Sequence, residues 1–207
     1  MKQEDLDLFA FWAHEAGKSG LVKCSSGNLS QRLSDGSMLI SGTGSWLPTI
    51  NTDEIARISI HGDHIDSSVK PSAEYRIHRG ILRERSDVNT VFHFQSPSAT
   101  TIACMNIKPD YNVIIEVPIY IGEVGYVPYL HPGSEGLAMA IVEQMKTVNI
   151  VQLTNHGQVV CGSDYRDVFR KAVFFEFACS ILLKSNFKIK TIPEDQIRKL
   201  VDYTSNF

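Results

Sequence analysis

Residues suited to metal binding and proton transfer gather at a few places in the chain. His93 and Gln95 close a short apolar run, Val91-Phe92-His93-Phe94-Gln95. Alternate side chains of a strand share a face, so His93 and Gln95 are expected to point to one side. Imidazole is a preferred zinc ligand, whereas a glutamine carbonyl oxygen is a weaker and harder donor. Taken alone, the pair fits either a metal site or a structural histidine.

Glu74 and His156 are candidates for the same site. Glu74 follows Pro71-Ser72-Ala73 at a predicted helix start, and His78 lies four residues later on the same helix face. A carboxylate at this position either stabilises the helix start or acts as a general base or metal ligand. His156 lies in the turn Asn155-His156-Gly157 between two apolar strands, where it is either exposed to solvent or directed into a cleft.

Two glycine-containing loops offer donors for an anion. In Ser26-Gly27-Asn28 and Ser41-Gly42-Thr43-Gly44, glycines allow backbone N–H groups to converge, and the polar side chains add further donors. Neither loop matches the P-loop pattern, because no Gly-Lys-Ser/Thr follows. Each is therefore an ordinary turn or part of a phosphate site. His61 and His64, at a predicted hairpin tip, and His14, on the first helix, are not assigned to a site.

The elements that must position these residues are helices mixed with hairpin-linked strands. Few strand–helix–strand units are present, which favours an antiparallel or mixed sheet covered by helices. We predict helices over 4–17, 70–85, 98–105, 134–146, 164–184 and 194–203. We predict strands or extended segments over 29–33, 38–40, 58–61, 64–66, 90–95, 111–118, 150–154 and 158–161.

Composition excludes several classes of protein. The 207 residues include 20 Lys+Arg and 23 Asp+Glu, with a net charge of −3 and 43% hydrophobic residues. The chain is too apolar to be disordered and too nearly neutral to bind nucleic acid through a broad basic face. Its length fits a single domain, residues 1–207.

An acidic start and the absence of a long apolar run predict no signal peptide and no membrane span. Four cysteines without a CxxC motif indicate reduced, mostly buried thiols in a cytoplasmic protein.

Taken in order, these motifs resemble the class II aldolase/adducin family. The resemblance covers residues 26–157 and includes Ser26-Gly27-Asn28-Leu29-Ser30 and Pro132-Gly133-Ser134. It implies an α/β fold with three α/β/α layers and a mixed, mostly antiparallel central sheet. It also implies one divalent metal per subunit, usually zinc, and a cyclic homotetramer with active sites between subunits.

The resemblance also assigns roles to residues of this sequence. Two positions depart from the family pattern, because Gln95 stands where a histidine is usual and Ala73 where a serine is usual. The implied roles are metal binding by His93, Gln95 and His156; acid–base catalysis by Glu74, with Tyr111 and Tyr203 as candidate proton donors; and phosphate binding by Asn28, Thr43, Gly44 and Ser72.

The implied reaction is cleavage of a small phosphorylated ketose, of the L-fuculose-1-phosphate type, to dihydroxyacetone phosphate and an aldehyde. Breaking a bond beside a ketone leaves an enediolate, whose charge a divalent cation stabilises. A methylthioribulose-phosphate dehydratase on the same scaffold is an alternative. A sugar-phosphate epimerase is another, although family epimerases typically carry Asp at the position of Glu74. A catalytically inactive, adducin-like binding module is a third, suggested by Gln95 and Ala73.

Overall fold

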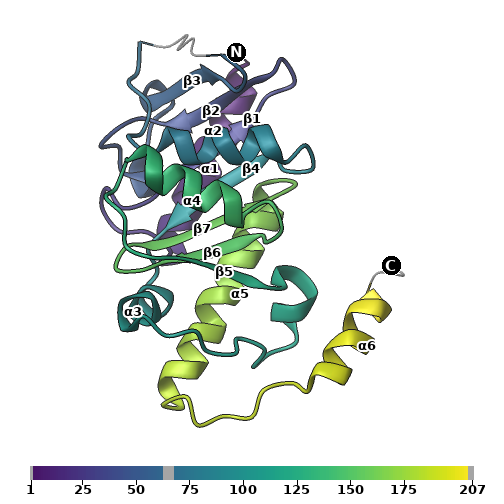
Figure 1. Cartoon of the computed structure of the whole chain (residues 1–207). Helices are drawn as coiled ribbons and strands as arrows, with labels where there is room; N and C mark the ends of the chain where they lie inside the picture. Colours follow the sequence, from purple (N-terminus) through teal and green to yellow (C-terminus); the bar gives the residue numbers. More distant parts are fainter. Residues whose placement is uncertain (1, 63–67, 205–207) are drawn as a thin grey trace.

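The computed structural model describes residues 2–62 and 68–204, and its strands form one mixed sheet. The strand order is β3-β2-β1-β4-β7-β6-β5 (Figure 1). Neighbouring strands are antiparallel, except that β5 and β6 are parallel. The strands are β1 (Asn28–Arg32), β2 (Ser37–Ser41), β3 (Ile55–Ser59), β4 (Thr90–Phe94), β5 (Val124–Val127), β6 (Ile150–Leu153) and β7 (Gly157–Gly162).

Helices cover both faces of this sheet, as Figure 1 shows. The helices are α1 (Gln3–Lys18), α2 (Tyr75–Glu84), α3 (Pro97–Met105), α4 (Glu135–Gln144), α5 (Tyr165–Lys184) and α6 (Glu194–Thr204). One apolar cluster joins the sheet to α1, α3 and α5, and a second joins it to α2 and α4. The predicted three-layer α/β/α fold with a mostly antiparallel sheet is therefore confirmed.

The central strand β4 shows how the sequence divides between the two layers. Phe92 and Phe94 belong to the cluster on the α1/α5 face, whereas Val91 belongs to the cluster on the α2/α4 face. Because side chains alternate along a strand, His93 lies on the α2/α4 face, as the sequence predicted. All five residues of β4 are buried, which fits a strand paired on both sides.

Most predicted elements are confirmed, but the region before β5 is not. Residues 111–118 were expected to be extended, yet they form turns that lead into a π-helical turn, Val117–Ile121. A short apolar run does not distinguish a strand from a buried helical turn by periodicity. Strand β5 was missed because it has only four residues, one of them Gly125. The strand expected over 64–66 lies outside the described residues. Strand β3, expected over 58–61, begins three residues earlier than predicted.

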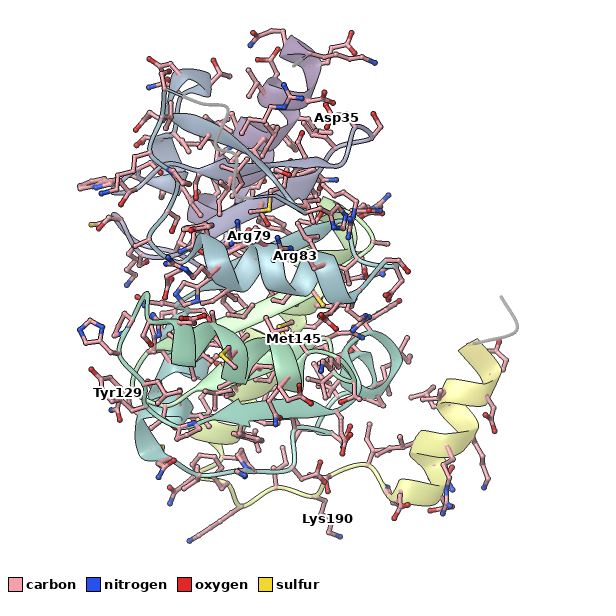
Figure 2. All side chains as sticks on the ribbon, turned by 45° about the horizontal axis from the view of Figure 1, so that its top comes forward. Asp35, Arg79, Arg83, Tyr129, Met145 and Lys190 are labelled. Carbon is pink, nitrogen blue, oxygen red and sulfur yellow. The ribbon has the colours of Figure 1, made fainter. Side chains whose placement is uncertain are left out.

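The C-terminal helix lies apart from the three layers. Figures 1 and 2 both show α6 beyond the segment that carries Lys190. Within residues 2–62 and 68–204, no helix has the length and hydropathy needed to cross a bilayer. The four cysteines form no disulfide, and Cys161 and Cys179 are buried. Cys24 and Cys104 are exposed, so the expectation of mostly buried thiols is wrong for half of them.

One carboxylate of α5 fixes the start of α3, which directly follows β4. Glu176 accepts hydrogen bonds from the Ser96 hydroxyl at 2.6 Å and from the backbone N–H groups of Ser98 and Ala99 at 2.8 Å each. It thus satisfies N–H groups that have no partner within their own helix. This contact ties the end of β4, and with it the candidate site, to the longest helix.

Replacing Glu176 by alanine is expected to lower the free energy of unfolding by about 2–3 kcal/mol, because buried donors lose a charged acceptor. Denaturant titration measures this change. Glu143→Ala is the matched control, because Glu143 pairs with Lys146 on the exposed side of α4. Exposed pairs contribute about 0–1 kcal/mol. Equal losses in the two variants would contradict the capping role of Glu176.

Candidate active site

Three predicted residues from separate elements meet at one end of the sheet. Glu74 precedes α2, His93 lies in β4, and His156 lies in the turn between β6 and β7. Their potential ligand atoms all lie within 4.8 Å of one another. Nε2 of His93 is 3.6 Å from Oε2 of Glu74, and Nε2 of His156 is 3.5 Å from Oε1 of the same carboxylate.

Local backbone geometry explains why His156 reaches the cluster. The turn that carries it contains Asn155 at φ +54°, a left-handed conformation that asparagine tolerates. The next residue, Gly157, packs against the end of β4. A Cβ at Gly157 would lie 2.5 Å from the Phe94 carbonyl oxygen and 3.2 Å from Cε1 of His93. Only glycine allows β7 to approach His93 this closely.

The polar atoms of the cluster fit a bound cation. Glu74 is 9% exposed and makes no side-chain capping bond to α2, which removes the interpretation of a simple helix cap. Its Oε1 is buried and has no hydrogen-bond partner among the described residues. A buried unpaired oxygen is costly, and a metal ion would satisfy it.

The orientation of His93 supports the same conclusion. Nδ1 of His93 lies 2.9 Å from the backbone carbonyl oxygen of Gln158, so Nδ1–H donates this bond. Nε2 is the ring nitrogen left to face Glu74. Metal-binding histidines are usually held in this way, with the second ring nitrogen bonded to a carbonyl or carboxylate. The donor set of two imidazoles and one carboxylate suits zinc and related divalent metals.

Electrostatics keep the cluster in the protonation state that ligands need. Burial alone would raise the pKa of Glu74, but His93, the Asn28 amide and His156 outweigh it, and the pKa lies below its usual value. Burial and the neighbouring His93 lower the pKa of His156 to about 4. Near neutral pH the carboxylate is thus ionised and the His156 imidazole is neutral, as metal ligation requires.

A second layer of buried polar groups supports Glu74. Asn28 Nδ2 donates to Oε2 of Glu74 at 3.0 Å, and Asn28 Oδ1 contacts Nε2 of His78. Nδ1 of His78 lies 2.7 Å from the Ser30 hydroxyl. The sequence placed His78 on the same helix face as Glu74, but it gave no sign that Asn28 stands between them. That contact depends on β1 lying beside β4, with Asn28 opposite His93.

The predicted ligand Gln95 lies at the edge of the cluster. Its side chain is half-buried, and its Cγ and the His93 ring pack against the same side of Gly157. The Gln95 amide makes no hydrogen bond to any described residue. The structure therefore leaves this amide available beside His93, and its ligation of a metal stays a prediction.

The residues expected to bind phosphate lie on two adjoining loops. Thr43 N–H donates to the Lys70 carbonyl oxygen at 2.9 Å, and Ser72 N–H donates to the Ser41 carbonyl oxygen at 3.0 Å. Thr43 and Gly44 are exposed, and Gly44 has φ +77°. Ser72 is buried, and its hydroxyl accepts from Glu74 N–H at 3.3 Å, so the loops continue directly into the cluster.

Neither predicted proton donor joins the cluster within this chain. Tyr111 is 4% exposed in the apolar cluster on the α1/α5 face, across the sheet from His93. Its hydroxyl accepts a hydrogen bond from Gln152 at 3.2 Å. Tyr203 is 64% exposed on α6, which lies apart from the sheet (Figure 1).

The fold and the site define a three-layer α/β protein with a candidate metal centre of two histidines and one glutamate at the end of its sheet. Residues 8–183 match the family model described as Class II Aldolase and Adducin N-terminal domain. The chain belongs to this family, which confirms the resemblance found in the sequence.

Named relatives within the family differ in their reactions. The 3-oxo-tetronate 4-phosphate decarboxylase of Escherichia coli (strain K12) is 32% identical over 152 residues, covering 72% of this chain and 71% of that protein. The 5-deoxy-D-ribulose 1-phosphate aldolase of Bacillus thuringiensis serovar kurstaki is 31% identical over 203 residues, covering 96% of this chain and 94% of that protein. The crystal structure of YgbL from Escherichia coli has a TM-score of 0.89 at 25% identity, covering 96% of this chain and 98% of that one.

Gly157→Ala is expected to weaken divalent-metal affinity on the order of ten-fold, because the added methyl displaces His93 from its supporting carbonyl. Isothermal titration with Zn²⁺ or Co²⁺ measures the change. Gly136→Ala is the control, because a Cβ there meets nothing within 4 Å. Unchanged affinity in Gly157→Ala would show that β7 does not set the position of His93.

Gln95→His is expected to raise zinc affinity on the order of ten-fold or more, because imidazole is a better zinc ligand than a neutral amide. Competition against a chromogenic chelator measures the affinity of both proteins. The control for adventitious binding by an added histidine is Gln144→His. Gln144 is exposed at the end of α4 and belongs to none of the predicted site residues. Equal affinity of wild type and Gln95→His would place residue 95 outside the metal site.

Proposed function

We propose that this protein is a divalent-metal-dependent lyase that breaks a carbon–carbon bond beside the ketone of a small phosphorylated sugar or sugar acid. The observation that carries the proposal is the buried cluster of Glu74, His93 and His156, in which one carboxylate oxygen has no hydrogen-bond partner among the described residues. These residues would hold a divalent cation, which would supply a Lewis acid for negative charge on the substrate's ketone oxygen.

The chain's own residues supply orientation and proton transfer. His93 and His156 hold their Nε2 atoms toward the Glu74 carboxylate, at 3.6 and 3.5 Å. Glu74 Oε1 is the group placed to take up a proton from solvent and relay it to the carbon that loses its bond. Donors on the loops of Thr43, Gly44 and Ser72 bind the phosphate and hold the reacting carbons in place, which converts binding into orientation.

Decarboxylation of a 3-oxo sugar acid phosphate is the reaction that this site fits best. Loss of CO₂ from such an acid takes up one proton at the carbon left behind and needs no proton removed from the leaving fragment. Release of an aldehyde also requires a group that takes a proton from the departing hydroxyl. Of the two tyrosines expected to move that proton, Tyr111 is buried on the opposite face of the sheet and Tyr203 is exposed on α6.

Aldol cleavage of a deoxyketose 1-phosphate is the second candidate. It is favoured by the 5-deoxy-D-ribulose 1-phosphate aldolase, whose match covers 96% of this chain. Both reactions leave the same phosphorylated three-carbon enediol, which becomes dihydroxyacetone phosphate after proton transfer to carbon. The finer predictions of L-fuculose 1-phosphate as substrate, zinc as the metal, a homotetramer and a cytoplasmic location belong to this proposal.

A substrate panel tests the proposal. Metal-loaded protein is incubated with 3-oxo-tetronate 4-phosphate, 5-deoxy-D-ribulose 1-phosphate, L-fuculose 1-phosphate or methylthioribulose 1-phosphate. Dihydroxyacetone phosphate reports carbon–carbon cleavage, and release of CO₂ or of an aldehyde identifies the reaction. We expect cleavage of the oxo acid with release of CO₂. Chelation of the metal should abolish turnover, and Glu74→Gln should lower it about 10²–10⁴-fold.

The possible outcomes separate the hypotheses. Aldehyde release with higher kcat/KM than CO₂ release supports aldol cleavage instead of decarboxylation. Loss of water from methylthioribulose 1-phosphate without formation of dihydroxyacetone phosphate contradicts both. A wild-type protein that holds no metal and cleaves none of these substrates supports an adducin-like binding role.

A further inference from the structure

The buried groups around Glu74 form a continuous chain of hydrogen bonds. It runs from Ser30 on β1 to His78 on α2, back to Asn28 on β1, and ends at Oε2 of Glu74. Ser30 and His78 are completely buried, and Asn28 is 6% exposed. Because the chain crosses twice between a strand and a helix, it fixes α2 relative to the strand that lies beside His93.

The chemistry of the groups sets the direction of every bond. A carboxylate can only accept, so Asn28 presents its NH₂ to Glu74 and its Oδ1 to His78. His78 must then donate from Nε2, and in a neutral ring Nδ1 accepts from the Ser30 hydroxyl. Burial lowers the pKa of His78 to about 3, which keeps the ring neutral near pH 7. All donors therefore point toward Glu74.

The two oxygens of Glu74 are consequently unequal. Oε2 is held by Asn28 at 3.0 Å, whereas Oε1 is buried without a hydrogen bond to any described residue and faces His156 at 3.5 Å. The side chain of Asn28 uses both its oxygen and its nitrogen inside the chain. The amide nitrogen of Asn28 has a second N–H, so this contact is compatible with the phosphate-binding role expected for Asn28 beside the loops of Thr43, Gly44 and Ser72.

We propose that Asn28 and His78 are positioning residues, which hold Oε2 of Glu74 so that Oε1 alone works on the metal and the substrate. Neither residue touches the reacting atoms. The proposal rests on the lyase function for its kinetic consequence, but its effect on metal affinity is independent of any substrate. It predicts that a substitution at His78, a residue remote from the phosphate loops, lowers kcat and metal affinity as a substitution at Asn28 does.

The test compares Asn28→Ala, His78→Leu and His78→Gln with wild type. Glutamine places an amide N–H near the position of Nε2, whereas leucine fills the space without a donor. Thr90→Val is the matched control, because it removes a partly buried hydrogen bond between β4 and β1, from Thr90 to Gln31, without touching the chain to Glu74. The measurements are kcat and KM for the substrate that wild type cleaves, the Kd of inorganic phosphate and of Co²⁺, and thermal stability.

We expect Asn28→Ala and His78→Leu to lower kcat and Co²⁺ affinity each on the order of 10–100-fold, as for other residues that support metal ligands. The Kd of phosphate should stay within about two-fold in His78→Leu, and the loss of Co²⁺ affinity in the double variant should be no larger than in the worse single variant. His78→Gln should recover most of both losses, and Thr90→Val should show neither.

Three results would overturn the proposal. Weaker phosphate binding with normal kcat and normal Co²⁺ affinity in Asn28→Ala would leave Asn28 with a phosphate-binding role alone. Equal losses in His78→Leu and His78→Gln at equal stability would indicate a packing role. Wild-type Co²⁺ affinity in both Asn28→Ala and His78→Leu would also contradict it, even if no substrate is cleaved; failure of the substrate panel alone contradicts only the lyase function.

Discussion

The hydrogen bond from Asn28 to Glu74 is the contact on which the candidate site depends. Glu74 lies at the start of a helix on one side of the sheet, where its carboxylate would otherwise be free to cap that helix or to face solvent. Asn28 ties it to β1, whose antiparallel pairing sets Asn28 opposite His93. The same pairing that builds the sheet therefore brings the carboxylate to the imidazole. The cost of burying an ionised group is offset by the amide and by a cation.

Much of this arrangement could be predicted from local sequence. The alternation of Phe92, His93 and Phe94 indicated which face of β4 carries the histidine, because side-chain period is a property of a strand alone. Long amphipathic segments such as α1 and α5 were equally readable, since a buried stripe repeats along them. The motif at Glu74 and the turn at His156 could be recognised because turns and helix starts use few residue types.

What the sequence could not supply were contacts across elements. Asn28 was assigned to phosphate from its loop, but its partners are decided by which strand and helix lie beside it. Tyr111 belonged to a segment expected to be extended, and the π-helical turn that follows places it in the core with Gln152 and Phe175. Both cases share one cause, because a side chain's role depends on neighbours that are more than 40 residues away in the chain.

The substitution at residue 95 bears on what kind of metal the site prefers. If Gln95 ligates the metal as predicted, two imidazoles, one carboxylate and an amide oxygen form a harder, more oxygen-rich donor set than three imidazoles and a carboxylate. Such a set gives zinc less advantage over metals that accept oxygen ligands, such as manganese. With one imidazole fewer, the carboxylate would contribute a larger share of the metal affinity, so its placement would matter more. A site of this composition depends more strongly on the groups that hold Glu74 than a site with a third histidine would.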